Sequence, residues 1–162
     1  MWKIEFGFTE IWHGSVFIEC SPLGWGHITV SRQDEHATEV TTRYEMMWIV
    51  LDLLELMSGL RDFFSNPRTK HYSFIATEGG CHIQIDRRKH SMVLLQIKEV
   101  KGLHPETEVL HAFREGLIHF MNEAYPLIDL DSLEKNAQSN SERALDGDFR
   151  REYQDFMAWC NR

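Results

Sequence analysis

The chain has 162 residues, of which 43% are hydrophobic and 26% charged; this fits one domain with a sizeable core and excludes a disordered or fibrous protein. The net charge of −8 argues against general nucleic-acid binding and favours a basic partner or simple solubility. The most apolar run, residues 46–51, is far shorter than the roughly 20 residues that span a bilayer, and the acidic start of the chain lacks a secretion signal. We therefore expect a cytoplasmic protein that does not associate with membranes.

The cysteines and the distribution of charge give two further expectations. Cys20, Cys81 and Cys160 cannot all pair within one chain, and no zinc-binding spacing is present, so we interpret them as reduced thiols. Residues 1–66 carry 10 acids and 4 bases, residues 67–102 carry 3 acids and 7 bases, and residues 103–162 carry 12 acids and 6 bases. Two acidic blocks therefore flank one basic block.

The first part of the chain predicts a three-stranded meander. Hydrophobic residues alternate with polar or small ones over residues 2–9, which is typical of a half-buried strand. The pattern returns at residues 16–20 and 27–32, with glycine and proline between them. A polar loop, residues 33–39, follows, with a short edge strand at its end as an alternative.

The longest helical pattern covers residues 42–64. Thr42 and Glu45 have the spacing of a capping box, and Pro67 after Asn66 stops the helix. The helix is apolar around most of its circumference and must be wrapped by other elements. Its polar stripe holds three acids, Asp52, Glu55 and Asp62, which we interpret as the solvent-facing side; if covered, they would have raised pKa values and be general acid or base candidates.

The same order of elements returns after Pro67. We expect strands at residues 71–77, 81–86 and 92–100, with glycine and basic turns between them, and an amphipathic helix over residues 105–125. Residues 127–141 read as a linker, and residues 142–161 as a C-terminal helix with one apolar stripe. That stripe suits docking on the body of the protein or on a partner, including a second subunit in a homodimer.

The fold class predicted is therefore α+β: a single domain, residues 1–162, with two antiparallel three-stranded meanders that are each followed by a long helix, βββα-βββα, plus the C-terminal helix.

No catalytic motif of the common hydrolases, P-loop ATPases or dinucleotide enzymes is present, so we assign no catalytic residue, no metal ligand and no cofactor. Two histidine constellations leave a metal-dependent enzyme as an alternative. Ordinary strand alternation and helical salt bridging explain the same spacing. The two sets are His82, Gln84, Asp86 and His90 on a strand and turn, and His111, Glu115, His119 and Glu123 along a helix.

A basic hairpin tip offers a second alternative. Arg87, Arg88, Lys89 and His90 follow one another in the turn between two predicted strands. Such a tip is suited to phosphate contacts with single-stranded nucleic acid, although no aromatic-rich RNA-binding pattern accompanies it. An ordinary solvated turn has the same composition.

The predicted partner-binding residues lie in the first third of the chain. Trp12 and Trp25 stand beside glycines, where aromatic side chains are common interface anchors or lids over a core edge. Asp34, Glu35 and Glu39 add negative charge in the polar loop, which would steer a basic partner and imitate phosphate.

The order of elements over residues 2–32, 42–64, 71–100 and 105–125 resembles the Whirly and PUR type of sheet-helix repeat, whose members bind single-stranded nucleic acid. Some bacterial immunity proteins, which block toxins of polymorphic and contact-dependent systems, look similar in architecture and in being small, acidic and poor in motifs. The resemblance implies an immunity-type inhibitor that neutralises a basic protein such as a nuclease toxin. It rests on element order and transfers no site.

Overall fold

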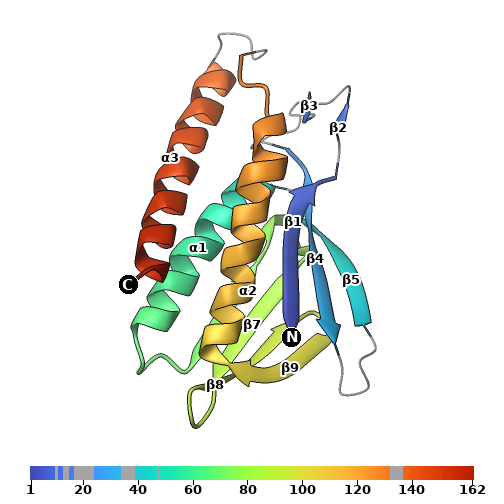
Figure 1. The fold of residues 1–162 in the computed structure, drawn as a ribbon. Helices are drawn as coiled ribbons and strands as arrows, with labels where there is room; N and C mark the ends of the chain where they lie inside the picture. The colour runs from blue at the N-terminus through green and yellow to red at the C-terminus, as the bar shows by residue number, and fades with distance from the viewer. Residues whose placement is uncertain (10, 13–14, 17–23, 34–38, 47, 132–136) are drawn as a thin grey trace.

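The computed structural model describes residues 1–9, 11–12, 15–16, 24–33, 39–46, 48–131 and 137–162. It contains two main antiparallel sheets, a small hairpin and three long helices (Figure 1). The first sheet has the order β1-β4-β5 and consists of β1 (Trp2–Phe8), β4 (Gly26–Gln33) and β5 (Glu39–Met46). The small hairpin pairs β2 (Ile11–Trp12) with β3 (Ser15–Val16).

The second sheet has four strands in chain order: β6 (His71–Ile75), β7 (His82–Arg87), β8 (Met92–Ile97) and β9 (Val100–Pro105). A short 3₁₀ turn, η1 (Thr77–Gly79), joins β6 to β7. The long helices are α1 (Ile49–Ser65), α2 (Glu106–His119) and α3 (Ala137–Cys160). A π-helical turn, η2 (Phe120–Ala124), and a 3₁₀ turn, η3 (Tyr125–Leu127), continue α2.

The helices gather on one side of the molecule and the first sheet forms the opposite flank (Figure 1). Helix α2 packs along β1 and also reaches β8 and β9, whereas α1 packs against β6 and α3. Strand β9 contacts the first sheet at two places. An Arg32 guanidinium nitrogen donates to the Lys101 carbonyl, and the Trp2 and His104 rings pack edge to face with their centres 5.7 Å apart. The described elements share one hydrophobic core.

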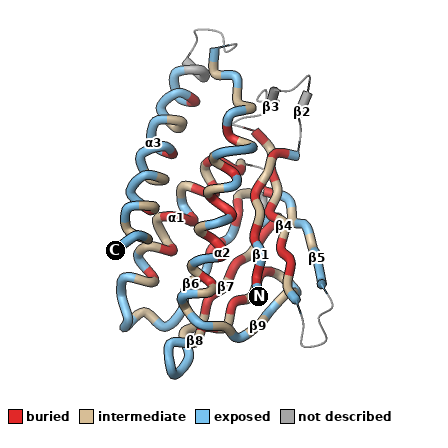
Figure 2. The backbone as a smooth tube through the Cα atoms, viewed as in Figure 1, coloured by how far each residue is buried: buried red, intermediate tan, exposed pale blue. Residues whose placement is uncertain are grey.

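The core is built from the inner faces of both sheets and from one stripe of each helix (Figure 2). Strand β1 alternates fully, because Trp2, Ile4, Phe6 and Phe8 are buried whereas the residues between them are not. The remaining large members come from β4, the second sheet and the helices; examples are Ile28, Val30, Ile83, Leu95, Leu53, Leu60, Phe113, Leu117, Phe149 and Phe156.

The register of the first sheet leaves a polar outer face. Lys3 lies opposite Ser31, which lies opposite Thr41, and Glu5 lies opposite Thr29. Lys3 and Thr41 are exposed on this face and Glu5 and Thr29 partly so, whereas Ser31 is buried.

The α+β class with antiparallel sheets is confirmed, and the strands expected at residues 2–9, 27–32, 71–77 and 81–86 are present with shifted ends. The strand expected at residues 16–20 lies mostly outside the described residues.

The helix predicted over residues 42–64 is wrong at its start. Residues up to Met46 belong to β5, and the helix begins at Ile49 without a side-chain cap. Its end is as predicted, because Asn66 leaves the helical region before Pro67.

Two further differences concern the second half. The strand expected over residues 92–100 is two strands, because the chain turns at Lys98, which has a φ of 52°, and returns as β9. The second sheet therefore has four strands rather than three. The C-terminal helix begins earlier than expected, at Ala137. No helix among the described residues is both long and apolar enough to cross a membrane.

Candidate functional site

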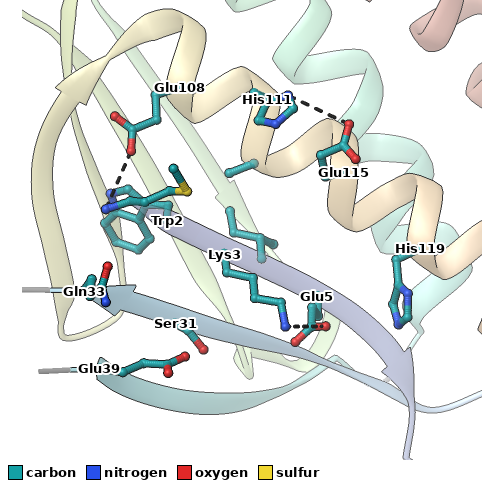
Figure 3. A pocket seen from close by; sticks show the side chains of 13 residues that line it. Trp2, Lys3, Glu5, Ser31, Gln33, Glu39, Glu108, His111, Glu115 and His119 are labelled. Carbon is teal, nitrogen blue, oxygen red and sulfur yellow. Dashed lines mark ion pairs between the residues drawn. The ribbon is translucent and has the colours of Figure 1, made fainter. Parts of the chain in front are cut away.

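A hollow of about 560 Å³ runs beside β1, between the outer face of the first sheet and α2. We call it the outer groove. Figure 3 shows its two walls: Glu108, His111, Glu115 and His119 project from the helix, and the side chains of β1, β4 and β5 lie across from them. Its lining residues are Met1, Trp2, Lys3, Ile4, Glu5, Ser31, Gln33, Glu39, Glu108, His111, Ala112, Glu115 and His119.

A glycine sets the distance between these walls. A Cβ atom at Gly116 would lie only 2.4 Å from the carbonyl oxygen of Ile4, so the helix backbone approaches β1 as closely as its atoms allow. Residues four apart share one side of a helix. Because Ala112 and Gly116 face β1, the adjacent positions His111, Glu115 and His119 line the rim of the groove.

The groove carries an excess of negative charge. Four carboxylates line it, those of Glu5, Glu39, Glu108 and Glu115, against two ammonium groups, the Lys3 side chain and the Met1 amino group. Lys3 pairs with Glu5 at 3.0 Å, and Arg114, outside the groove, pairs with Glu115 at 2.7 Å.

Weaker pairings involve the other groups of the rim. His111 lies 3.8 Å from Glu115, while His104 and the Met1 amino group lie 3.3 Å and 3.8 Å from Glu108. Glu39 takes part in none of the ion pairs found among the described residues and points at the groove from the start of β5. An open, acidic hollow of this kind attracts cationic groups.

A smaller hollow of about 350 Å³ continues from the outer groove, with which it shares Glu5 and His119. Next to it the sheet carries a polar network. The Thr9 hydroxyl donates to Glu45 at 2.8 Å and accepts from Arg43 at 3.3 Å. Burial lowers the pKa of His27, Arg43 lowers it further and Glu45 opposes the shift. We therefore expect the His27 side chain, which lines this smaller hollow, to be neutral.

The five predicted partner-binding residues are not brought together in one described site. Glu39 lines the outer groove, as just described. Asp34, Glu35 and the Trp12 side chain lie outside the described residues. Trp25 is half-buried, and its indole Nε1 is buried without a hydrogen-bond partner among the described groups. The structure therefore places one of the five residues in the groove, and the prediction for the others stays open.

The basic tip needs a correction at Arg87. Its side chain is only 8% exposed and all five of its N–H groups have acceptors. Nε and Nη2 donate to the two oxygens of Glu106, Nη1 donates to the carbonyls of Asn66 and Thr69, and Nη2 also donates to that of Phe63. The guanidinium also lies 4.4 Å from the centre of the Phe63 ring. Arg87 therefore ties the end of α1 to the start of α2, and the prediction that it contacts phosphate is wrong.

The rest of the tip is exposed and has basic neighbours. Arg88, Lys89 and His90 are exposed, and Arg88 lies 3.7 Å from Asp86. The backbone N–H of Arg87 donates to the Lys70 carbonyl at 2.8 Å, which places the loop after α1 beside the hairpin. We call the group formed by Arg68, Lys70, Arg88, Lys89 and His90 the basic end; all five residues are exposed.

The acidic stripe of α1 is only partly solvent-facing. Glu55 and Asp62 are exposed, but Asp52 is 1% exposed, so its interpretation as a wet residue is wrong. One oxygen of Asp52 accepts from the Thr77 backbone N–H at 2.9 Å and hydroxyl at 2.8 Å, and the other has no partner among the described groups. Burial raises the pKa of Asp52, and the hydrogen bonds from Thr77 only partly offset it.

Two histidines of the second sheet have polar partners on a neighbouring strand. His71 lies 2.6 Å from Asp86, and His82 lies 2.9 Å from the Ser73 hydroxyl. Among the described residues, no group of three or more His, Cys, Asp or Glu side chains is placed to hold a metal ion. Burial raises the pKa of the Cys81 thiol to about 12, which makes it a poor nucleophile. Cys20 lies outside the described residues.

Sequence reasoning missed the outer groove, although two of its signals were visible. The spacing of His111, Glu115 and His119 marks one side of a helix, and Lys3 and Glu5 mark the polar face of a strand. Nothing local to either segment says that these two faces meet, because the contact joins residues more than 100 positions apart.

Comparisons with known proteins give no further identification. No family model, no curated protein and no solved structure matches this chain. The resemblance to immunity proteins and to the Whirly and PUR architecture therefore stays a prediction.

Proposed function

We propose that this protein binds a basic partner protein through the outer groove and inhibits it, in the manner of an immunity protein that neutralises a toxin. The observation that carries the proposal is the groove itself: four carboxylates, against the ammonium groups of Lys3 and Met1, surround a hollow of about 560 Å³. A cationic segment that enters would find carboxylate acceptors on both walls, from β1 and β5 on one side and from α2 on the other.

The net charge of −8 supports the proposal, because a negative molecule attracts a basic partner before contact. Inhibition follows if the captured segment belongs to the working surface of the partner. A nuclease is a suitable partner class, because its nucleic-acid site is basic and carboxylates can occupy the places of phosphates.

Affinity capture tests the proposal. Wild-type protein, expressed in its own cells, is expected to retain a basic protein that mass spectrometry identifies. Combined Glu39→Lys and Glu115→Lys substitution should abolish the capture, since it reverses both walls of the groove. The matched control is combined Glu55→Lys and Asp62→Lys on the exposed side of α1, which reverses the same charge elsewhere. Capture of no basic protein, or equal loss with the control, contradicts the proposal.

A second candidate function is binding of single-stranded nucleic acid by the basic end. The observation that favours it is the contact between the α1–β6 loop and the β7–β8 hairpin, which adds Arg68 and Lys70 to the exposed residues of the tip. If the four Arg and Lys side chains each contact one phosphate, the affinity for a single strand falls about 50-fold between 50 and 200 mM salt.

Fluorescence anisotropy with labelled single-stranded DNA and RNA measures this dependence. Combined Arg88→Ala and Lys89→Ala substitution should halve the salt slope, whereas combined Arg143→Ala and Arg151→Ala substitution on the exposed side of α3 should leave it unchanged. Absence of salt-dependent binding by the wild-type protein removes this candidate.

A further inference from the structure

The C-terminal helix, expected to dock on the body or on a second subunit, packs on α1 of its own chain. Phe149 and Phe156, from its apolar stripe, are fully buried there. The apolar stripe of α3 is therefore not available for a contact between two copies of this chain, and we consider another surface. The first sheet offers one, because no described strand pairs with β5 on the side away from β4.

Strand β5 is an open sheet edge. It forms the outer limit of the first sheet in Figure 1, and most of it is coloured as exposed in Figure 2. Glu39, Val40, Thr41, Arg43 and Glu45 are all exposed. An edge strand of eight residues without proline is a template for pairing with another strand.

The direction of the backbone groups shows which residues would pair. A Cβ atom at Gly80, just after η1, would lie 2.2 Å from the Glu45 carbonyl oxygen, so that oxygen faces away from β4. Backbone groups alternate in direction along a strand. Those of Glu39, Thr41 and Arg43 therefore also face the open edge, beyond the part that Gly80 covers.

We propose that two copies of this chain associate by antiparallel pairing of their β5 strands, centred on Thr41. In this register Glu39 of each copy lies opposite Arg43 of the other, which forms two symmetric cross-strand ion pairs. Val40 lies opposite Thr42 of the second copy on the inner face, and the two Thr41 side chains meet on the outer face.

Charge selects this register over its neighbours. Centring the pair on Thr42 would place Glu39 opposite Glu45, and centring it on Arg43 would place two Arg43 side chains opposite each other. Like charges directly opposite each other destabilise an antiparallel pair. Centring it on Tyr44 would again join opposite charges, Arg43 with Glu45, but would need the Glu45 carbonyl that Gly80 covers. Among the registers that avoid this covered end, the one centred on Thr41 makes opposite charges meet at both ends of the contact.

The inner face of the same edge also favours a second copy. Val40 is 48% exposed, which is high for a large aliphatic side chain. A hollow of about 460 Å³ lies beside it, lined by Arg32, Val40, Thr42, Glu99, Val100 and Lys101. Pairing would bring Val40 and Thr42 of the second copy to this hollow and remove both Val40 side chains from water.

Sedimentation velocity on the chain alone tests the proposal, without any partner, so its outcome is independent of the groove. Because a pairing of about five residues a side buries less than a standard interface, we expect a monomer at about 10 µM and a growing dimer fraction toward about 1 mM. Arg43→Glu should weaken dimerisation about tenfold, since it places two carboxylates opposite each other twice.

The combined Glu39→Arg and Arg43→Glu substitution is the decisive variant. It exchanges the two charges and should restore dimerisation to nearly the wild-type level, although the contacts of Arg43 with Thr9 and Glu45 within the chain remain lost. Thr41→Pro removes an N–H that faces the open edge and leaves the pairing with β4, so it should abolish the dimer. A monomer at all concentrations, failure of the charge exchange to restore association, or a dimer that Thr41→Pro does not change overturns the proposal.

Discussion

At the scale of single residues, two buried ionisable groups, Arg87 and Asp52, have opposite surroundings. Every N–H of Arg87 has an acceptor, whereas Asp52 has one oxygen bonded to Thr77 and one without a partner among the described groups. A fully paired buried charge holds elements together, and an incompletely paired carboxyl favours its protonated form. In the sequence, Arg87 is part of a basic run and Asp52 is part of an acidic stripe. Neither pattern indicates which of its residues is buried in the folded protein.

The stability of the protein should depend on pH through Asp52. In the unfolded chain this carboxyl has its ordinary pKa of 3.8, and burial raises the folded-state pKa above that. Below pH 3.8 both states are protonated, so Asp52 has no effect. As the pH rises the unfolded chain loses this proton first, so the free energy of unfolding falls until the pH passes the folded-state pKa.

Urea unfolding between pH 3 and pH 8 measures this effect. Asp52→Asn keeps an oxygen for Thr77 and cannot ionise, so its stability relative to the wild type should increase as the pH rises above about 4. Asp62→Asn on the exposed side of the same helix is the control and should show no such trend. A constant difference between Asp52→Asn and wild type across this range would contradict a raised pKa.

Arg87 gives the second residue-scale prediction. Arg87→Ala should lower the free energy of unfolding by about 3 to 5 kcal/mol, because it leaves the Glu106 carboxylate without its charged partner and removes the hydrogen bonds to the carbonyls of Asn66, Thr69 and Phe63. Arg88→Ala, one residue away on the exposed tip, should change it by less than about 0.5 kcal/mol. Chemical denaturation of both variants is the measurement, and equal effects would mean that Arg87 does not clamp the helix ends.

At the scale of elements, the position of α2 against β1 rests on Gly116. Gly116→Ala should destabilise the protein although alanine is the better helix former, because a Cβ 2.4 Å from the Ile4 carbonyl pushes the helix away from the strand. Gly147→Ala in α3 is the matched control. Nothing lies within 4 Å of a Cβ there, so this change should stabilise the protein by about 0.5 to 1 kcal/mol.

Thermal unfolding compares these two variants, and binding of a basic partner provides a second measurement. If the helix moves off β1, the outer groove changes width, so Gly116→Ala should weaken partner binding whereas Gly147→Ala should not. Stabilisation by Gly116→Ala would show that the contact between helix and strand adapts freely.

The elements that the sequence predicted well are those whose pattern is local. The alternation of β1 follows from four large apolar residues at every second position, and the end of α1 follows from Pro67. Strand β5 was mistaken for the start of a helix because Thr42 and Glu45 imitate a capping box. What decides its state is pairing with β4, which a local pattern cannot show. Strand β9 was missed because its turn uses Lys98 at positive φ in place of glycine.

At the scale of the whole molecule, the three charge blocks of the sequence form two surfaces of opposite sign. The basic block, residues 67–102, contains most of the second sheet and all five residues of the basic end. The acids of β1, β5 and α2 converge instead on the outer groove. The sequence predicted the sign of the charge and one residue of the groove, Glu39. It could not predict the groove because β1 and α2, which face each other across it, lie about 100 positions apart in the sequence.

This separation predicts that the groove acts mainly on the rate of association. Charges around an open hollow act beyond contact distance in dilute salt, where the Debye length is about 30 Å at 0.01 M, and lose this reach at 0.15 M, where it is about 8 Å. Combined Glu39→Gln and Glu115→Gln substitution should therefore slow association with a lysine-rich peptide about tenfold at low salt, change dissociation much less, and lose most of its effect at physiological salt.

Stopped-flow kinetics across this range of salt separates the two rates. Combined Glu55→Gln and Asp62→Asn substitution on α1 removes the same charge from a surface outside the groove and should slow association less. An equal effect of the two double variants would assign the attraction to net charge alone. A loss that lies in dissociation and persists at high salt would instead mean that Glu39 and Glu115 act by direct, desolvated contacts, because only screened, long-range attraction disappears with salt.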